Sequence, residues 1–233
     1  MITPAHQSVL GSVLSPARRR AFIDWACTGS GLLIEDDYDG EFRYGRQPVG
    51  ALQAMAPENV AYLGSVSKTL GPALRLGWMV LPRRLVEPVS EAKYYADVQT
   101  EVIGQLVLAE LIRTHAYDRH VRARRLRYRS RRDELLRRLA CEAPEVRARG
   151  AAAGLHITLE LPPGGAPAGE LRAIAAAHGL ALLDLGRSWH VADPARPVSV
   201  MVGYATPADH AYSAALDALC ATLRAAVSGG KAS

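Results

Sequence analysis

Residues 64–77 read Gly-Ser-Val-Ser-Lys-Thr-Leu-Gly-Pro-Ala-Leu-Arg-Leu-Gly, and they follow the short apolar run Val60–Gly64, which suits a buried strand. Of the 28 basic residues, only Lys68, Lys93 and Lys231 are lysines. A lysine in apolar surroundings loses solvation of its charged form, so its pKa falls and its free amine can attack an aldehyde. The alternative is a lysine at a strand end whose amine reaches into solvent.

The segment Glu35–Glu41, Glu-Asp-Asp-Tyr-Asp-Gly-Glu, follows a second apolar run at residues 32–34. Ligands of open α/β sheets bind at the carboxyl ends of strands, which favours a functional role for these acids. Two other interpretations stay open, namely an exposed acidic turn and a magnesium site, because hard cations prefer carboxylates.

Several other kinds of site are excluded. The phosphate loop of nucleotide triphosphatases requires a glycine directly before its lysine, and Ser67 stands there. The small hydroxyl side chains around Lys68 can still hold a phosphate. The histidines show no metal-ligand spacing, and the chain contains no Gly-x-Ser-x-Gly motif, so we expect neither a metal site built on histidines nor a serine hydrolase.

The composition indicates a globular protein, since 49% of the 233 residues are hydrophobic and 22% are charged. No apolar run approaches the ~20 residues of a membrane span and no signal peptide is evident, so we expect a cytoplasmic location without membrane contact. The net charge of +5 is concentrated in an arginine-rich segment, residues 113–149. That pattern favours a solvated, salt-linked helix, with a nucleic-acid surface as the second interpretation.

The order of segments predicts an α/β part, residues 1–113, and a small α+β domain, residues 114–233, that opens with the long arginine-rich helix. In the first part, buried strands separated by helices indicate a mainly parallel sheet with helices on both faces. The predicted strands cover 32–34, 60–64, 77–81, 156–161, 181–185 and 198–204, and the predicted helices cover 17–27, 102–112 with a wide buried face, 117–139, 170–177 and 206–227.

Three motifs, at residues 3–7, 34–44 and 65–77, together resemble fold-type I pyridoxal-phosphate enzymes of the class I/II aminotransferase family. The resemblance is nearest to the aminotransferase-like domain of MocR/GabR-type transcriptional regulators and covers most of residues 1–140. It implies a partial major domain of that fold, pyridoxal 5′-phosphate as cofactor, and transfer of an amino group between an amino acid and a keto acid.

The resemblance also implies roles for individual residues. Lys68 would carry the cofactor as a Schiff base and, once displaced, move the proton of the substrate α-carbon. Asp36 would keep the pyridine nitrogen protonated, because an adjacent carboxylate favours the cationic ring. Tyr38 would direct its hydroxyl toward the phenolic oxygen of the cofactor.

The remaining implied contacts concern the phosphate and the ring face. Ser65, Ser67 and Arg75 match the phosphate ligands of the family, with Arg75 seven residues after the lysine. His6 and Gln7 would line the ring, where ordinary aminotransferases present an asparagine.

This sequence departs from the family pattern in three respects. Residues 8–11 read Ser-Val-Leu-Gly and lack the proline that stiffens the turn, and Met201 stands where the arginine for the substrate carboxylate is expected. Arg187 or Arg196 could replace that arginine. The chain matches only the C-terminal portion of the family, so a truncated regulator is expected, without the first half of the major domain and without the helix-turn-helix.

Two functions from different classes follow from the resemblance. One is an aminotransferase-type enzyme, and the other is a non-enzymatic, effector-sensing domain of a transcriptional regulator. An inactive fragment is a third possibility. The expected partners are a small-molecule amine or amino acid and a second copy of the chain in a homodimer, with DNA bound only through a helix-turn-helix domain absent from this chain.

Overall fold

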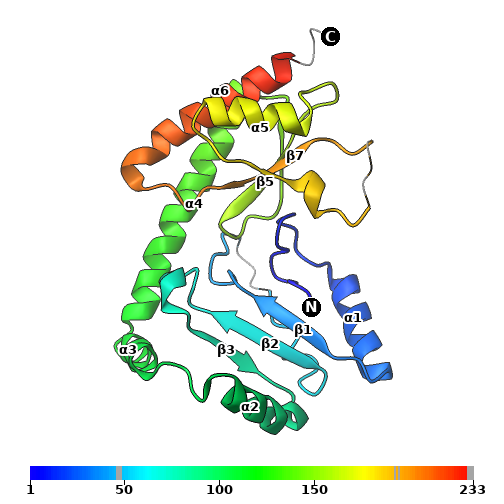
Figure 1. Ribbon diagram of the computed structural model, residues 1–233, viewed down its shortest axis with the longest axis vertical. Coiled ribbons are helices and arrows are strands. Elements are labelled where there is room, and N and C mark those ends of the chain that lie inside the picture. The colour runs from blue at the N-terminus through cyan, green and yellow to red at the C-terminus, as the bar shows by residue number, and fades with distance from the viewer. Residues whose placement is uncertain (46–48, 192, 194, 230–233) are drawn as a thin grey trace. The chain divides into compact units, whose positions relative to one another are not determined.

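The computed structural model describes residues 1–45, 49–191, 193 and 195–229, which are drawn in colour in Figure 1. The chain divides into two compact units, the first of residues 1–7 and 12–126 and the second of residues 8–11 and 127–233. The division falls within a long helix, after residue 126. The domain boundary at residues 113–114 that the composition suggests stays a prediction.

The first unit is built on a sheet of three strands whose order is β1 (Leu33–Asp37), β2 (Val60–Ser65) and β3 (Gly77–Val80). β1 and β2 run parallel, and β3 is antiparallel to β2 (Figure 1). Ile2 forms a further parallel bridge with Glu35, so the N-terminal segment lies beside β1. The helices of this unit are α1 (Pro16–Thr28), α2 (Arg83–Asp97), α3 (Val102–Arg113) and the first part of α4 (Ala116–Glu142).

Helix α1 begins where the sequence predicts. The Ser15 hydroxyl accepts a hydrogen bond from the backbone N–H of Arg18, and proline occupies the first helical position. The buried Ala26 of this helix packs in a cluster with Leu33 of β1 and Val60 of β2. This cluster covers the face of the sheet on which Leu33 and Val60 lie, and α1 packs against that face.

A second close contact of this sheet involves its edge strand, β3. A Cβ atom at Gly64 would collide with the ring of Trp78, so the absence of a side chain at Gly64 leaves room for that ring. The ring lies on the same face of the sheet as Glu35 and Asp37. Trp78 is nevertheless 40% exposed. A side chain at residue 64 would therefore displace the Trp78 ring.

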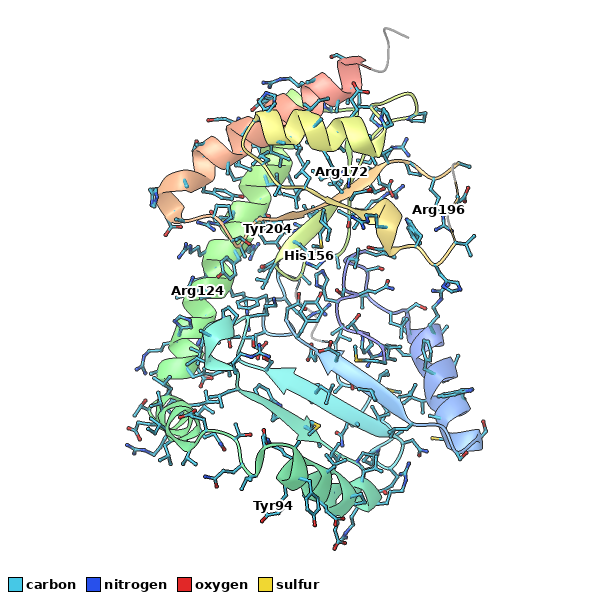
Figure 2. The ribbon with its side chains drawn as sticks, viewed as in Figure 1. Tyr94, Arg124, His156, Arg172, Arg196 and Tyr204 are labelled. Atoms are coloured by element: carbon cyan, nitrogen blue, oxygen red, sulfur yellow. The ribbon has the colours of Figure 1, made fainter. Side chains whose placement is uncertain are left out.

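The burial predicted for β3 and α3 is wrong. All residues of these two elements are described, and none is buried; Ile103 of α3, for example, is 74% exposed. A helical period identifies an apolar face but does not provide the layer that covers it. Helix α2, which contains Pro88, is not predicted from the sequence, and its Tyr94 points into solvent (Figure 2).

The second unit contains an antiparallel sheet in the order β4 (Arg147–Arg149), β5 (His156–Glu160), β7 (Ser199–Gly203) and β6 (Leu183–Asp184). The remainder of α4 belongs to it, with α5 (Ala168–Ala177) and α6 (Tyr212–Gly229). The long helix predicted at 117–139 is confirmed. The last helix begins later than predicted, because residues after Pro207 first form a 3₁₀ turn, Asp209–Ala211. Two further 3₁₀ turns cover Pro72–Leu74 and Leu185–Ser188.

Candidate functional site

The carboxyl ends of β1 and β2 meet at one edge of the first sheet, because the two strands are parallel. Asp36 pairs in register with Leu63. Side chains alternate between faces along a strand, so Asp36 and Ser65 lie on the same face, on neighbouring strands about 4.8 Å apart. The structure therefore brings together the ends of the two segments that carry the candidate acid and the candidate lysine.

The loop after β2 is held by its own hydroxyl groups. The Oγ of Ser65 donates to the Oγ of Ser67 at 2.8 Å, and the backbone N–H of Ser67 donates to the Oγ of Ser65 at 3.0 Å. Lys68 follows directly and is exposed, and its amine makes no hydrogen bond or ion pair with the described residues. The apolar surroundings that the sequence suggests for this amine are absent, and the amine is open to solvent.

Arg75, the candidate phosphate ligand, has an unusual backbone conformation. Its φ of 51° and ψ of 29° lie in the left-handed region, directly after the 3₁₀ turn Pro72–Leu74. Non-glycine residues adopt this conformation at a cost of about 1–2 kcal/mol, and such residues concentrate at functional sites. The guanidinium is exposed and has no partner among the described residues, so it is available to an anion.

The acidic segment is not the exposed turn that was one interpretation of it. Glu35 is 1% exposed, and its two carboxylate oxygens accept the backbone N–H groups of Leu52 and Gln53, each at 3.0 Å. Asp37 accepts a hydrogen bond from the hydroxyl of Tyr62 at 2.9 Å. Burial raises the pKa of both carboxyl groups. Both carboxylate oxygens of Glu35 therefore have backbone partners, whereas the contact with Tyr62 engages only Oδ2 of Asp37.

A third acid, Asp39, contacts His6, one of the two residues expected to line the ring. It is 2% exposed and lies 2.8 Å from Nδ1 of the buried His6. The hydroxyl of Tyr38 lies 3.3 Å from the same nitrogen. The side chain of Gln7 is exposed and accepts a hydrogen bond from the hydroxyl of Ser12 at 3.0 Å. The structure thus brings His6 and Tyr38 together through their shared contact, whereas Gln7 is engaged elsewhere.

Asp36 differs from its acidic neighbours. It is half-buried, and its carboxyl group accepts no hydrogen bond from the described residues. Burial raises its pKa, and the nearby carboxylates of Asp37 and Asp39 raise it further. A cation placed beside this carboxyl would have the opposite effect, because an adjacent positive charge favours the anion.

Sequence reasoning missed two residues of α4 that contact the lysine loop. The hydroxyl of Tyr117 lies 3.1 Å from Oγ1 of Thr69 and 3.4 Å from Oε1 of Glu41. Nε2 of His120 lies 2.9 Å from the carbonyl oxygen of Thr69, the residue after Lys68. Tyr117 and His120 are three residues apart, which places them on one face of a helix. This spacing does not show which residue they contact.

The two arginines considered for a substrate carboxylate lie in the second unit. Arg196, labelled in Figure 2, stacks over the ring of Trp189 at 4.0 Å, and its Nε lies 3.4 Å from Asp193. Arg187 is exposed in the 3₁₀ turn that precedes Trp189. Met201 lies in β7, as the sequence places it. Neither arginine is identified as a substrate ligand by these contacts.

The arginines of α4 are largely engaged in ion pairs, as the salt-linked interpretation expects. Arg127 and Arg131 both contact Asp209 at 2.8 Å, and Arg137 contacts Glu134 at 2.6 Å. Among the described residues, no helix combines the length and apolar character that crossing a membrane requires. The cytoplasmic location stays a prediction.

A family model of aminotransferases of class I and II matches residues 1–164, which include all the candidate cofactor contacts. The chain belongs to this family. The predicted fold is confirmed by the crystal structure of LysN, the α-aminoadipate aminotransferase of Thermus thermophilus, complexed with N-(5′-phosphopyridoxyl)-L-leucine. This aminotransferase aligns with 99% of the chain at a TM-score of 0.83 and 25% identity, and the alignment covers 58% of LysN.

Relatives of this aminotransferase-like domain include both regulators and enzymes. The uncharacterized HTH-type transcriptional regulator YhdI of Bacillus subtilis is 37% identical over 87% of the chain, which corresponds to 43% of YhdI. The 2-aminoadipate transaminase of Thermus thermophilus is 30% identical over 70% of the chain and 42% of the transaminase. The predicted resemblance to regulators of this type is confirmed. The chain spans less than half the length of either relative.

Proposed function

We propose that this aminotransferase-like domain binds pyridoxal 5′-phosphate at the edge of the first sheet and holds it through Lys68. The register of β1 and β2 carries the proposal, because it puts Asp36 and Ser65 on one face where the lysine loop begins. The chemistry of the donor set also fits the cofactor: a carboxyl group for the ring nitrogen, hydroxyl groups and a guanidinium for the phosphate, and an amine for the aldehyde.

The phosphate would be held by Ser65, Ser67 and Arg75. The hydrogen bond between the two serine hydroxyls keeps both groups side by side, at the start of the loop. Arg75 contributes a guanidinium with no competing partner among the described residues, and arginine binds phosphate through paired, charge-assisted hydrogen bonds. The left-handed backbone of Arg75 is the kind of strain that a binding role explains.

Asp36 would hold the proton of the pyridine nitrogen. Its raised pKa reflects burial beside two other acids without a cationic partner, and a protonated ring would supply that partner. When bound, pyridoxal 5′-phosphate supplies an aldehyde that condenses with amines and a ring that withdraws electrons. The hydroxyl of Tyr38 would approach the phenolic oxygen of the cofactor, and His6, which is held by the buried Asp39, would line the ring. Gln7 would have to exchange its contact with Ser12 for the ring.

Lys68 would also supply the proton transfer that an aminotransferase needs. Its exposed amine is open to an incoming amine or amino acid. As a general base, the Nζ atom would accept the proton of the substrate α-carbon and return it later. The substrates we propose are an amino acid and a keto acid, and the proposed assembly is a homodimer.

The second candidate function is effector sensing without turnover. The similarity to HTH-type regulators such as YhdI favours it. Binding of an amine at Lys68 would then bias a conformational equilibrium, and DNA would be bound through a helix-turn-helix domain. The same residues serve both functions, so the cofactor site is tested first.

Borohydride reduction followed by peptide mapping tests the site. The chain is incubated with pyridoxal 5′-phosphate, reduced, digested and analysed by mass spectrometry. We expect the added mass on Lys68, and its loss in Lys68→Arg. Lys93→Arg is the matched control, since Lys93 is already paired with Asp97 at 2.8 Å and should leave labelling unchanged. An adduct confined to Lys93 or Lys231 would overturn the assignment.

The choice between enzyme and sensor requires a second experiment. Amino acids are added to the cofactor-loaded chain, and conversion of the cofactor to its amine form is followed by absorbance. Conversion that is lost in Lys68→Arg supports the enzyme. For the sensor, a fusion with the N-terminal half of a regulator such as YhdI is tested for DNA binding with and without the amine. DNA binding that does not respond to any amine counts against sensing.

A further inference from the structure

The second unit contains a cavity of about 180 Å³ that none of the proposed cofactor contacts line. Its walls come from α4, β7, α6 and the segment before β6, and they include Leu135, Leu182, Met201 and Leu219. Leu135 and Leu219 are buried, and Met201 is half-buried. The walls are therefore formed mostly by aliphatic side chains.

The hydroxyl groups of the two tyrosines in the wall are engaged with backbone carbonyls. Tyr204, labelled in Figure 2, donates to the carbonyls of Ala153 and Gly154. Tyr212 donates to the carbonyl of Arg131. These rings present carbon atoms to the cavity and little hydrogen-bonding capacity. Thr206 adds one more hydroxyl group to the wall. A wall with so few polar groups holds water poorly, because a bound water needs two to four polar partners.

Arg131, which contacts Tyr204 and Tyr212 of the wall, also has partners of its own. The guanidinium of Arg131 stacks over the ring of Tyr212 at 4.5 Å and contacts Asp209 at 2.8 Å. It further donates to the carbonyl oxygens of Tyr204 and Ala205. With these partners, Arg131 is not available to pair with an anionic ligand. A charged molecule in the cavity would lose its hydration without compensation.

We propose that this cavity binds a small uncharged molecule with a single apolar ring. Its volume is similar to that of an engineered cavity of about 150 Å³ that binds benzene. It is below the range of about 300–1,000 Å³ for drug-sized ligands, which excludes a molecule as large as a phosphorylated cofactor. The proposal does not depend on the function of Lys68.

Toluene is the probe, and benzoate is its charged counterpart. The full chain is labelled at methionine and leucine methyl groups and titrated with each compound by NMR. We expect saturable shifts and intermolecular contacts at Met201 and Leu219 with toluene and none with benzoate. A titration with toluene that does not saturate, or contacts only at exposed residues such as Ile103 of α3, would overturn the proposal.

Two substitutions on α6 sharpen the test. Ala215 lines the cavity, whereas its neighbour Ala214 is exposed and does not. Ala215→Phe should fill the space and weaken toluene binding at least about tenfold, while Ala214→Phe should leave it unchanged. Equal binding by both variants would contradict the assignment. If Ala215→Phe does not fold, the contacts between toluene and Met201 in the unmodified chain decide.

Discussion

The hydroxyl of Tyr117 lies 3.1 Å from the hydroxyl of Thr69, one residue after Lys68. His120, one turn further along α4, lies with its Nε2 atom 2.9 Å from the carbonyl of the same threonine. Thr69 is 2% exposed, and both contacts are partly shielded from water. The helix therefore holds the loop next to Lys68 through side chain and backbone together.

Tyr117→Phe should lower the free energy of unfolding by about 1 kcal/mol. The substitution removes the hydroxyl shared by Thr69 and Glu41, and the net value of a hydrogen bond is about 0.5–1.5 kcal/mol. Urea denaturation of the full chain measures the change. Tyr95→Phe is the control, because Tyr95 is 78% exposed, and it should change stability by less than about 0.5 kcal/mol. Equal effects of the two variants would mean that the Tyr117 hydroxyl contributes nothing.

Glu35→Ala should destabilise the protein by about 2–4 kcal/mol, because the two backbone N–H groups of Leu52 and Gln53 lose their acceptor in a buried place. The adjacent Asp36→Ala is the matched control. Asp36 points to the other face and its carboxyl group accepts no hydrogen bond from the described residues, so its removal should leave stability unchanged or slightly higher. Urea denaturation measures the free energy of unfolding of both variants. A larger loss of stability for Asp36→Ala than for Glu35→Ala would contradict this division of roles.

In the absence of the cofactor, Asp36→Asn should raise the free energy of unfolding by an amount that depends on pH. The pKa of Asp36 is raised in the folded state, so the protonated form favours folding below the unfolded pKa near 3.8. This contribution is lost as the pH rises through the raised folded pKa. The variant should therefore match the original chain near pH 3.5 and be more stable at pH 8, by less than about 1 kcal/mol given the partial exposure.

Thermal unfolding across this pH range measures the difference between the two chains. In the same variant, binding of pyridoxal 5′-phosphate should weaken, since the amide cannot hold the proton of the ring nitrogen. A stability difference that is constant with pH would show that titration of Asp36 is not its cause.

Arg131→Met should cost about 2 kcal/mol. The substitution leaves the buried carbonyl of Tyr204 without its donor and breaks the pair with Asp209, although Asp209 itself is 71% exposed, which reduces the loss. Arg129→Met is the comparison, because the pair of Arg129 with Asp133 is long, at 3.9 Å, and exposed on both sides. Its removal should change stability by less than about 0.5 kcal/mol in chemical denaturation.

The sequence shows which segments meet at the candidate site, whereas the surroundings of the site depend on strand register and on contacts between distant residues. Asp36 and Ser65 could be expected to meet because each lies at the carboxyl end of a strand, and parallel strands end at one edge. Glu35 and Asp36 are indistinguishable as neighbouring acids in a cluster. Only the register separates the acid that binds backbone N–H groups from the one on the face of Ser65.

Long-range contacts account for most of what sequence reasoning missed. Tyr117 fits the apolar period of α4, and nothing local indicates that its hydroxyl reaches Thr69, 48 residues earlier. Likewise, the apolar residues of α3 give a clear helical period, yet their burial depends on a covering layer that the period does not specify. The resemblance to a family supplied the roles of Lys68 and Arg75, which their spacing alone leaves open.

The close fit of Trp78 against Gly64 provides an optical probe beside the candidate site. The indole lies next to the residue that precedes Ser65, on the other face of the same strand. Only two other tryptophans, Trp25 and Trp189, add to the emission of the chain. Intrinsic fluorescence can therefore report ligand binding at the end of β2 without an attached dye, and replacement of Trp25 and Trp189 by phenylalanine would isolate that signal.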